Sequence, residues 1–278
     1  MDKSVVKKLQ MYQLQMLKDI DRVCKNNNIQ YYVTWGSALG AVRHGGFIPW
    51  DDDIDISMTW DNYIRFEKIA QKELGDKYFY QSQETDEFCF TLWNKVRINN
   101  TTSMEKHLRH IKCHYGICMD IFPIVGVPNS AIKRLIQKLQ ILIYRIFSYE
   151  RYLTNKNPEG NTLFKIIYGV FPKKFKEYIK NKCLKEITKY KINDCDECIE
   201  FLSGSYNKML FKSNMFGNGK KILFEDMEVI IPEKYHEYLT RCYGDYMVLP
   251  PEEDRIGHGD AIVDFDKSYE YYWENGDE

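Results

Sequence analysis

The hydrophobic positions between residues 5 and 26 recur every three or four residues, which is the spacing of an amphipathic helix. Three asparagines at positions 26–28 end this pattern. Residues 29–34, with the sequence IQYYVT, are rich in aromatic and β-branched side chains and predict a β-strand. Gly36 and Ser37 interrupt that strand, and residues 38–44 predict a short helix that ends at two glycines. The chain therefore begins as helix, strand, turn and helix.

Predicted helices and strands continue to alternate after this first unit. From Asp53 to Ile56 acidic and apolar residues alternate, which predicts a strand with carboxylates on one face and isoleucines on the other. Residues 60–74 predict an amphipathic helix, and residues 88–98 and 116–124 predict two further strands. Strand-like sequence returns at residues 222–231, and a helix is predicted over residues 233–242.

A basic segment interrupts this order. Residues 131–190 carry a net charge of +10, so the remainder of the chain carries −11. The segment is helix-like throughout, with breaks around residues 155–160 and at Pro172. We therefore divide the chain into residues 1–128, a basic helical insertion over residues 129–200, and a part over residues 201–278 that returns to strand-like and turn-rich sequence.

Composition excludes several classes of protein. The chain has 278 residues, with 44% hydrophobic and 28% charged residues, which are ordinary values for a globular protein. A formal charge of −1 and a pI of about 6.6 give no reason to expect a nucleic-acid partner. No uncharged apolar run approaches the ~18–20 residues of a membrane span, and the charged N-terminus lacks the apolar core of a signal peptide. We therefore expect a cytoplasmic protein.

The eight cysteines show no regular framework, and reduced thiols are expected in a chain without a secretory signal. Cys195 and Cys198 have the CxxC spacing, but no second CxxC completes a four-ligand zinc site. A denser cluster consists of His107, His110, Cys113 and His114. These side chains could bind a zinc ion, but we favour the interpretation that they form a polar surface segment.

Four carboxylates lie within five residues, at Asp51, Asp52, Asp53 and Asp55. They repel one another unless a cation neutralises them, and Mg²⁺ or Mn²⁺ prefers oxygen ligands of this kind. On a strand, Asp53 and Asp55 would share a face about 7 Å apart and could bind one ion. A solvated acidic turn is the alternative. The turn at residues 36–37 could hold a phosphate on its backbone N–H groups, and Arg43 together with Lys95 or Arg97 could hold a second phosphate.

These acids lie in a longer motif. Residues 35–58, WGSALGAVRHGGFIPWDDDIDISM, closely resemble the signature of the LicD family, which belongs to the nucleotidyltransferase-fold superfamily and includes bacterial phosphocholine transferases and the fukutin-related proteins. Later blocks that match the family lie at residues 95–97, 100–102, 116–123 (GICMDIFP) and 243–251 (YGDYMVLPP), followed by Arg255 and His258. The resemblance extends from about residue 5 to residue 260 and is weakest in the basic insertion.

The resemblance implies an α+β fold, with a nucleotidyltransferase-like central mixed sheet flanked by helices. Residues 1–128 would form the catalytic core, and residues 201–278 would complete the active site. The implied activity is metal-dependent transfer of a phospho-substituent, typically phosphocholine from CDP-choline, to a hydroxyl of a cell-surface glycan, teichoic acid or lipopolysaccharide precursor. A related CDP-alcohol is the alternative donor. A DxD glycosyltransferase that uses a nucleotide sugar and a non-catalytic glycan-binding relative are the alternative functions.

The resemblance also implies roles for single residues. Asp53 and Asp55 would bind Mg²⁺ or Mn²⁺, two ions in all, and Asp120 would be the third carboxylate of the metal site and the base for the acceptor hydroxyl. Asp51 and Asp52 remain possible ligands. The residues expected to bind the donor are Gly36, Ser37, Arg43, Lys95, Arg97, Arg255 and His258. The aromatic residues that could hold a choline group by cation–π attraction are Trp35, Trp50, Trp93 and Tyr115.

The basic insertion permits two interpretations. Its helices combine Lys and Arg with apolar residues such as Leu135, Leu139 and Leu142, which suits an anionic membrane face or a polyanionic, lipid-linked glycan. A core-packing subdomain with a solvated, Lys-rich exterior would show the same pattern. The first interpretation would make this a cytoplasmic protein that contacts the inner face of the cell membrane peripherally.

Overall fold

A mixed β-sheet forms the centre of the molecule. The computed structural model describes residues 1–150, 169–257 and 260–275. In these ranges seven strands form one sheet, in which five follow the order β1-β2-β6-β4-β3, while β7 pairs with β6 and β8. β2 and β6 are parallel and the other pairs are antiparallel. The strands are β1 (Tyr32–Val33), β2 (Asp55–Thr59), β3 (Tyr78–Gln81), β4 (Asn94–Ile98), β6 (Cys118–Val127), β7 (Glu197–Glu200) and β8 (Leu210–Lys212). The predicted mixed α/β class is confirmed.

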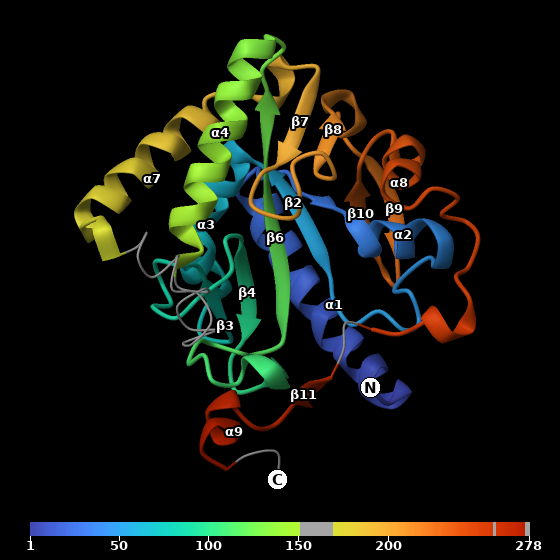
Figure 1. Ribbon diagram of the computed structural model, residues 1–278. Helices are drawn as coiled ribbons and strands as arrows, with labels where there is room; N and C mark the ends of the chain where they lie inside the picture. The colour runs from blue at the N-terminus through green and yellow to red at the C-terminus, as the bar shows by residue number, and fades with distance from the viewer. Residues whose placement is uncertain (151–168, 258–259, 276–278) are drawn as a thin grey trace.

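Helices and two small sheets surround this centre. Figure 1 shows α4 and α7 on one side of β6, with α8 and the β9–β10 hairpin on the other. The helices are α1 (Lys3–Asn26), α2 (Trp35–His44), α3 (Trp60–Leu74), α4 (Ala131–Ser148), α7 (Lys173–Thr188), α8 (Tyr235–Tyr243) and α9 (Tyr269–Asn275). The small sheets pair β9 (Lys220–Phe224) with β10 (Met227–Ile231), and β5 (Thr102–Glu105) with β11 (Ala261–Asp264).

The two faces of the sheet differ in chemistry. Successive residues of a strand point to opposite faces. On β2, Ile56 and Met58 are fully buried and belong to the main core, together with Leu17 of α1 and Phe66 of α3. The other face carries residues 55, 57 and 59, whose partners in register on β6 are residues 120, 122 and 124. That second face is where the acidic residues lie.

Helix predictions with strong periodicity agree with the structure, whereas the boundaries around the motif differ. α3 spans the predicted residues 60–74, and α1 lies within two residues of its predicted start. The Gly-Ser pair was expected to precede a helix, yet α2 already begins at Trp35, whose φ of 50° turns the chain there. β2 begins at Asp55, so Asp53 precedes the strand and does not share its face in the predicted way.

The basic segment is helical where the structure describes it. α4 and α7 pack on each other, and the Gln137 side chain joins them to the sheet by donating to the carbonyl oxygens of Gly126 (2.9 Å) and Ile187 (3.2 Å). The predicted break at Pro172 is confirmed, since α7 begins directly after it. The break expected around residues 155–160 lies outside the described residues. Within the described ranges, no helix has both the length and the apolar character needed to cross a membrane.

Candidate active site

The first turn of α2 and the start of β2 are joined by hydrogen bonds. The Asp55 N–H donates to Ser37 Oγ (2.9 Å), and the Asp55 carbonyl oxygen accepts from the Thr34 N–H (3.0 Å). A Cβ atom added at Gly36 would lie 2.9 Å from Asp51 Oδ2, so a larger residue there would displace that carboxylate. The Gly-Ser turn and the acidic residues are therefore one structural unit, with Ser37 acting on the backbone of β2.

Two glutamines of α1 bind the backbone of the loop that carries the acidic residues. Gln10 Nε2 donates to the carbonyl oxygens of Ile48 (3.1 Å) and Asp51 (2.9 Å), and Gln13 Nε2 donates to the carbonyl oxygen of Asp52 (2.9 Å). Both side chains are almost fully buried. Sequence analysis missed them, although polar residues on the buried side of an amphipathic helix are the signal that could have identified them.

Asp55 is surrounded by other carboxylates. Burial is the main cause that raises its pKa well above the usual range, and the negative charges of Asp53, Asp120 and Asp51 raise it further. Asp55 and Asp120 lie directly opposite each other on adjacent parallel strands. A hard divalent cation, which prefers oxygen ligands, would relieve the repulsion between these carboxylates.

Two side chains hold the Asp120 carboxylate, one from β4 and one from the residue that precedes β4. Lys95 Nζ lies 2.5 Å from one carboxylate oxygen, and Trp93 Nε1 donates to the other at 2.8 Å. Burial acts to lower the pKa of Lys95, but Asp120 and Cys118 together outweigh this effect and the net shift of the pKa is upward. In the described part of the chain, no three His, Cys, Asp or Glu side chains are arranged as a group that could hold a metal ion. Lys95 thus neutralises Asp120 in this arrangement.

The acids open into a cavity of about 400 Å³, which we call the acidic cavity. Its polar side comes from Asp51, Asp53 and Asp55, and Lys208 also lines it. Its apolar side comes from Trp35, Leu39, Ile48, Trp50, Phe122, Met209, Tyr243 and Ile256. Two of the four aromatic residues expected near a bound donor, Trp35 and Trp50, are therefore in its wall.

Two arginines lie close together beside this cavity. Arg43 Nη1 donates to the Tyr246 carbonyl oxygen (2.8 Å), and Arg255 Nε donates to the Pro250 carbonyl oxygen (2.9 Å). The Arg255 guanidinium lies 5.5 Å from the centre of the Trp50 ring. Burial lowers the pKa of Arg43, and the nearby positive charge of Arg255 lowers it further. Guanidinium groups bind phosphate oxygens through two hydrogen bonds, so both side chains are candidates to hold an anion at this edge of the cavity.

Glu200 of β7 is a buried carboxyl group that sequence analysis did not single out. It accepts hydrogen bonds from Ser57 Oγ (2.5 Å) and from Trp35 Nε1 (2.9 Å), and Ser57 Oγ also lies 2.8 Å from Thr34 Oγ1. Trp35 has the left-handed backbone that a bulky residue rarely adopts, so Glu200 and the Tyr238 hydroxyl, which accepts from the Trp35 N–H, stabilise an unfavourable conformation. Glu200 thereby positions a wall of the acidic cavity.

We expect Glu200→Gln to flatten the pH dependence of stability. Burial raises the pKa of Glu200 from 4.5 to about 7, so the protonated form is favoured in the folded protein. Its contribution to the free energy of unfolding is therefore complete below pH 4.5 and is lost as the pH rises through 7. The loss is at most about 3 kcal/mol. Urea unfolding between pH 4.5 and 8 measures this, and the difference between the two proteins isolates Glu200 from Asp55. Parallel stability curves would contradict the assignment.

Comparison with known proteins decides the family. Residues 28–134 match the family model described as LicD/FKTN/FKRP, nucleotidyltransferase domain. The chain is also similar to the lipopolysaccharide cholinephosphotransferase LicD of Haemophilus influenzae, with 32% identity over 273 residues that cover 93% of this chain and 97% of the relative. This chain belongs to the LicD family. A shorter match, 38% identical over 47 residues, covers 17% of this chain and 10% of ribitol 5-phosphate transferase FKRP of Homo sapiens.

Some of the residues expected to form the LicD-type site lie elsewhere. Arg97 is buried, its guanidinium donates to Gln81 Oε1 and to the Gly116 carbonyl oxygen (2.8 Å), and it does not line the acidic cavity. Tyr115 is buried in a separate cluster, where its hydroxyl donates to the Leu108 carbonyl oxygen (2.7 Å). His258 lies outside the described residues.

The His and Cys residues outside the LicD motif that could have formed a zinc site are packed against other side chains or exposed. His114 stacks on Phe79, with ring centres 4.9 Å apart, and its Nδ1 accepts from the Gly116 N–H. Burial and the positive charge of Arg97 lower the pKa of His114 to about 3, so the ring is neutral. In the same cluster Cys113 is buried, whereas His107 is exposed. The eight cysteines, all of them in described ranges, are free thiols.

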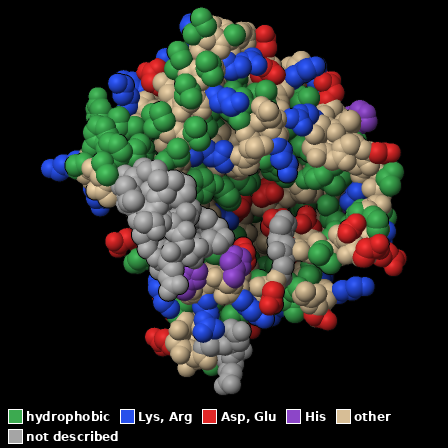
Figure 2. Space-filling model, viewed as in Figure 1, with side chains coloured by type: hydrophobic (Ala, Val, Ile, Leu, Met, Phe, Trp, Pro, Cys, Tyr) green, Lys and Arg blue, Asp and Glu red, His purple; other side chains and the backbone are tan. Residues whose placement is uncertain are grey.

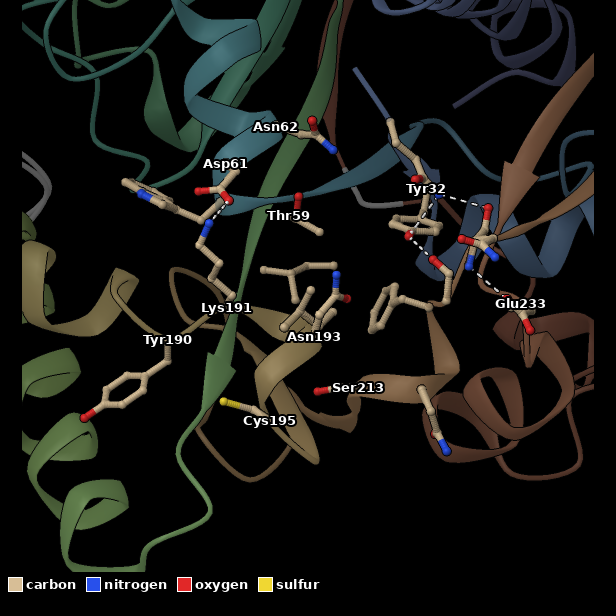
Figure 3. A pocket seen from close by; sticks show the side chains of 18 of the residues that line it. Tyr32, Thr59, Asp61, Asn62, Tyr190, Lys191, Asn193, Cys195, Ser213 and Glu233 are labelled. Atoms are coloured by element: carbon tan, nitrogen blue, oxygen red, sulfur yellow. Dashed lines mark hydrogen bonds and ion pairs between the residues drawn. The ribbon is translucent and has the colours of Figure 1, made fainter. Parts of the chain in front are cut away.

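A larger cavity, of about 510 Å³, lies at the other end of β2 in this LicD-family fold (Figure 3). Thr59 lines it, four residues and about 13 Å along the strand from Asp55. Asp61 pairs with Lys191 (3.1 Å), and Glu233 accepts from the Asn218 N–H (2.8 Å). In the smaller cavity Asp53 and Asp51 instead raise the pKa of Asp55 by their negative charge, so we place the candidate chemistry at the smaller cavity.

Proposed function

We propose that this chain transfers phosphocholine, or a related phospho-substituent, from a CDP-linked donor to a hydroxyl of a cell-surface glycan precursor. The observation that carries the proposal is the acidic cavity, which Asp51, Asp53 and Asp55 line beside the Gly36 turn, with Asp120 opposite Asp55 on the adjacent strand. The similarity to a lipopolysaccharide cholinephosphotransferase over nearly the whole chain, and the shorter match to a ribitol 5-phosphate transferase, support this class of reaction.

We propose Asp53 and Asp55 as ligands of Mg²⁺ or Mn²⁺, with two ions in all and Asp120 as the third carboxylate. The negative charges of Asp53, Asp120 and Asp51, which add to the effect of burial in raising the pKa of Asp55, support this assignment. When bound, the metal supplies a Lewis acid that neutralises charge on the donor phosphates.

The remaining steps belong to side chains of this protein. The acceptor hydroxyl oxygen forms a bond to the phosphorus that carries choline, the bond from that phosphorus to the oxygen of CMP breaks, and CMP leaves. The hydroxyl proton passes to the Asp120 carboxylate, which Lys95 and Trp93 hold in place. Arg43 and Arg255 bind the donor phosphates, an assignment supported by their proximity beside the cavity.

The wall of the acidic cavity suits a quaternary ammonium group. Trp35, Trp50 and Tyr243 present aromatic surface to the same cavity as the acids. A cation over such rings gains roughly 0.5–2 kcal/mol for each good contact. The aromatic wall supports choline over an uncharged polyol as the transferred group. We also propose that the protein acts in the cytoplasm, against the inner face of the cell membrane.

Incubation of the purified protein with a donor and a glycan acceptor extract tests the function. With Mg²⁺ and CDP-choline we expect CMP to be released and labelled choline to enter the glycan. CDP-ethanolamine and CDP-ribitol should react more slowly, because neither carries a quaternary ammonium group. Release of a nucleoside diphosphate from a nucleotide sugar would instead identify a glycosyltransferase, and binding of the glycan without turnover of any donor would identify a non-catalytic relative.

A further inference from the structure

One face of α4 exposes a continuous row of large apolar side chains. Their exposed fractions range from 38% to 73%. With 3.6 residues per turn, the row covers an arc of about 120° on the helix. It consists of Ile132, Leu135, Ile136, Leu139, Leu142 and Ile143, and we call it the α4 apolar face. Monomeric soluble proteins rarely expose apolar side chains in such a contiguous group.

The opposite side of the same helix is the side that packs on the protein. Gln137, Ile141 and Ser148 are buried there, and Gln137 bonds to the backbone of β6 and α7. The exposure of the apolar face is therefore not the result of a detached helix. Of the two interpretations of the basic insertion, core packing accounts for the buried side of α4 and leaves the apolar face without an explanation.

Basic side chains border the α4 apolar face on both sides. On the helical wheel Lys133 lies beyond one edge of the row and Lys138 beyond the other, and both are exposed. Long lysine side chains at the edge of an apolar stripe can reach the lipid headgroups while the stripe enters the acyl region. The whole segment 131–190 carries a charge of +10.

The exposed apolar surface continues onto the beginning of α7. Phe171 contacts Phe147 of α4, with ring centres 6.0 Å apart, and stacks on Phe175. Val170, Phe175 and Tyr178 are also exposed. Figure 2 shows hydrophobic side chains gathered over α4 and α7, with Lys and Arg side chains beside them. The surface is thus larger than one helix and is built from two packed elements.

We propose that the α4 apolar face, together with the start of α7, docks the protein on an anionic lipid bilayer. The occupant is a membrane because the apolar row lies between cationic edges, an arrangement complementary to acyl chains below anionic headgroups. With the proposed function, this docking would place the transfer reaction at the membrane surface, and vesicle binding can be measured without turnover.

Vesicle sedimentation tests the proposal. The protein should bind vesicles of phosphatidylglycerol and phosphatidylcholine in equal parts, bind pure phosphatidylcholine vesicles much more weakly, and lose most of its binding at about 0.5 M salt. Combined Leu135→Ser and Leu139→Ser should weaken binding at least about tenfold. Combined Lys133→Gln and Lys138→Gln should weaken it about fivefold for each lysine removed.

Matched controls separate the surface from general effects. Met11 and Leu223 are equally exposed apolar residues on α1 and β9, so combined Met11→Ser and Leu223→Ser should leave vesicle binding unchanged. Lys72→Gln, at an exposed position of α3, should do the same. Asp53→Asn, expected to abolish turnover, should also bind like the parent protein, so a failed reaction and a failed docking surface remain distinguishable.

Several outcomes would overturn the docking proposal. These are equal binding to neutral and anionic vesicles, no binding to either, or equal losses in the α4 variants and their controls. A dimer in analytical ultracentrifugation that the Leu135 and Leu139 changes dissociate would assign the face to a second copy of the chain instead. Circular dichroism spectra verify that each variant is folded.

Discussion

Replacement of Asp55 by asparagine should lower turnover at least about 100-fold while the protein stays folded. The proposed metal would lose a ligand, and with it the stabilisation of charge on the donor phosphates. The fold should tolerate the change because Asp55 is half-buried beside Asp53, Asp120 and Asp51, and both burial and these charges raise its pKa. Removal of one of these charges relieves repulsion, so the melting temperature should be unchanged or higher. CMP release from CDP-choline and thermal unfolding by circular dichroism measure the two effects.

The controls for this prediction are a distant acid and a chelator. Asp76→Asn, at an exposed position after α3, should retain full activity. EDTA should abolish the activity of the parent protein, and Mg²⁺ or Mn²⁺ should restore it. Asp53→Asn should resemble Asp55→Asn. Full turnover of either variant, or undiminished turnover in EDTA, would exclude the proposed metal site.

Sequence patterns predicted correctly the helices whose apolar spacing and end signals lie within the helix itself. α1 and α3 have regular apolar spacing and clear ends, and both agree closely with the structure. The motif at residues 35–58 also identified the family correctly, because its glycine, serine and acidic residues all lie within one short stretch of sequence. Boundaries failed where long-range contacts set them. α2 begins early because Trp35 is held by Glu200 and Tyr238, which are 165 and 203 residues away.

The same reason explains the site residues that sequence analysis missed or interpreted incompletely. Gln10 and Gln13 act on carbonyl groups about 40 residues away, and a helical pattern carries no information about that distance. Lys95 was expected to bind phosphate, but the register of β4 against β6 puts it opposite Asp120. For α4 the periodicity was correct, yet an amphipathic pattern does not state which face is buried; Gln137 and Ile141, not the leucines, face the protein.

Replacement of Asp120 should reduce the rate far more than the affinity for the donor. If Asp120 accepts the proton of the acceptor hydroxyl, Asp120→Asn should lower kcat about 100-fold or more and change the KM for CDP-choline little, because a general base acts in the transition state. Asparagine keeps the shape of the side chain and can still accept from Trp93 Nε1. Steady-state kinetics at saturating acceptor measure both constants. A normal kcat with a raised KM would show that Asp120 binds the donor instead.

A second substitution separates this catalytic role from the ion pair with Lys95. Asp120→Asn leaves the Lys95 ammonium, 12% exposed, without its partner, and should therefore destabilise the fold by about 3 kcal/mol. The combination of Lys95→Met with Asp120→Asn removes both charges and should recover most of that stability. If Asp120 is the base, the double variant should be as slow as Asp120→Asn, since stability returns but the proton acceptor does not. Recovery of turnover together with stability would show that Asp120 serves only to keep Lys95 and the sheet in place.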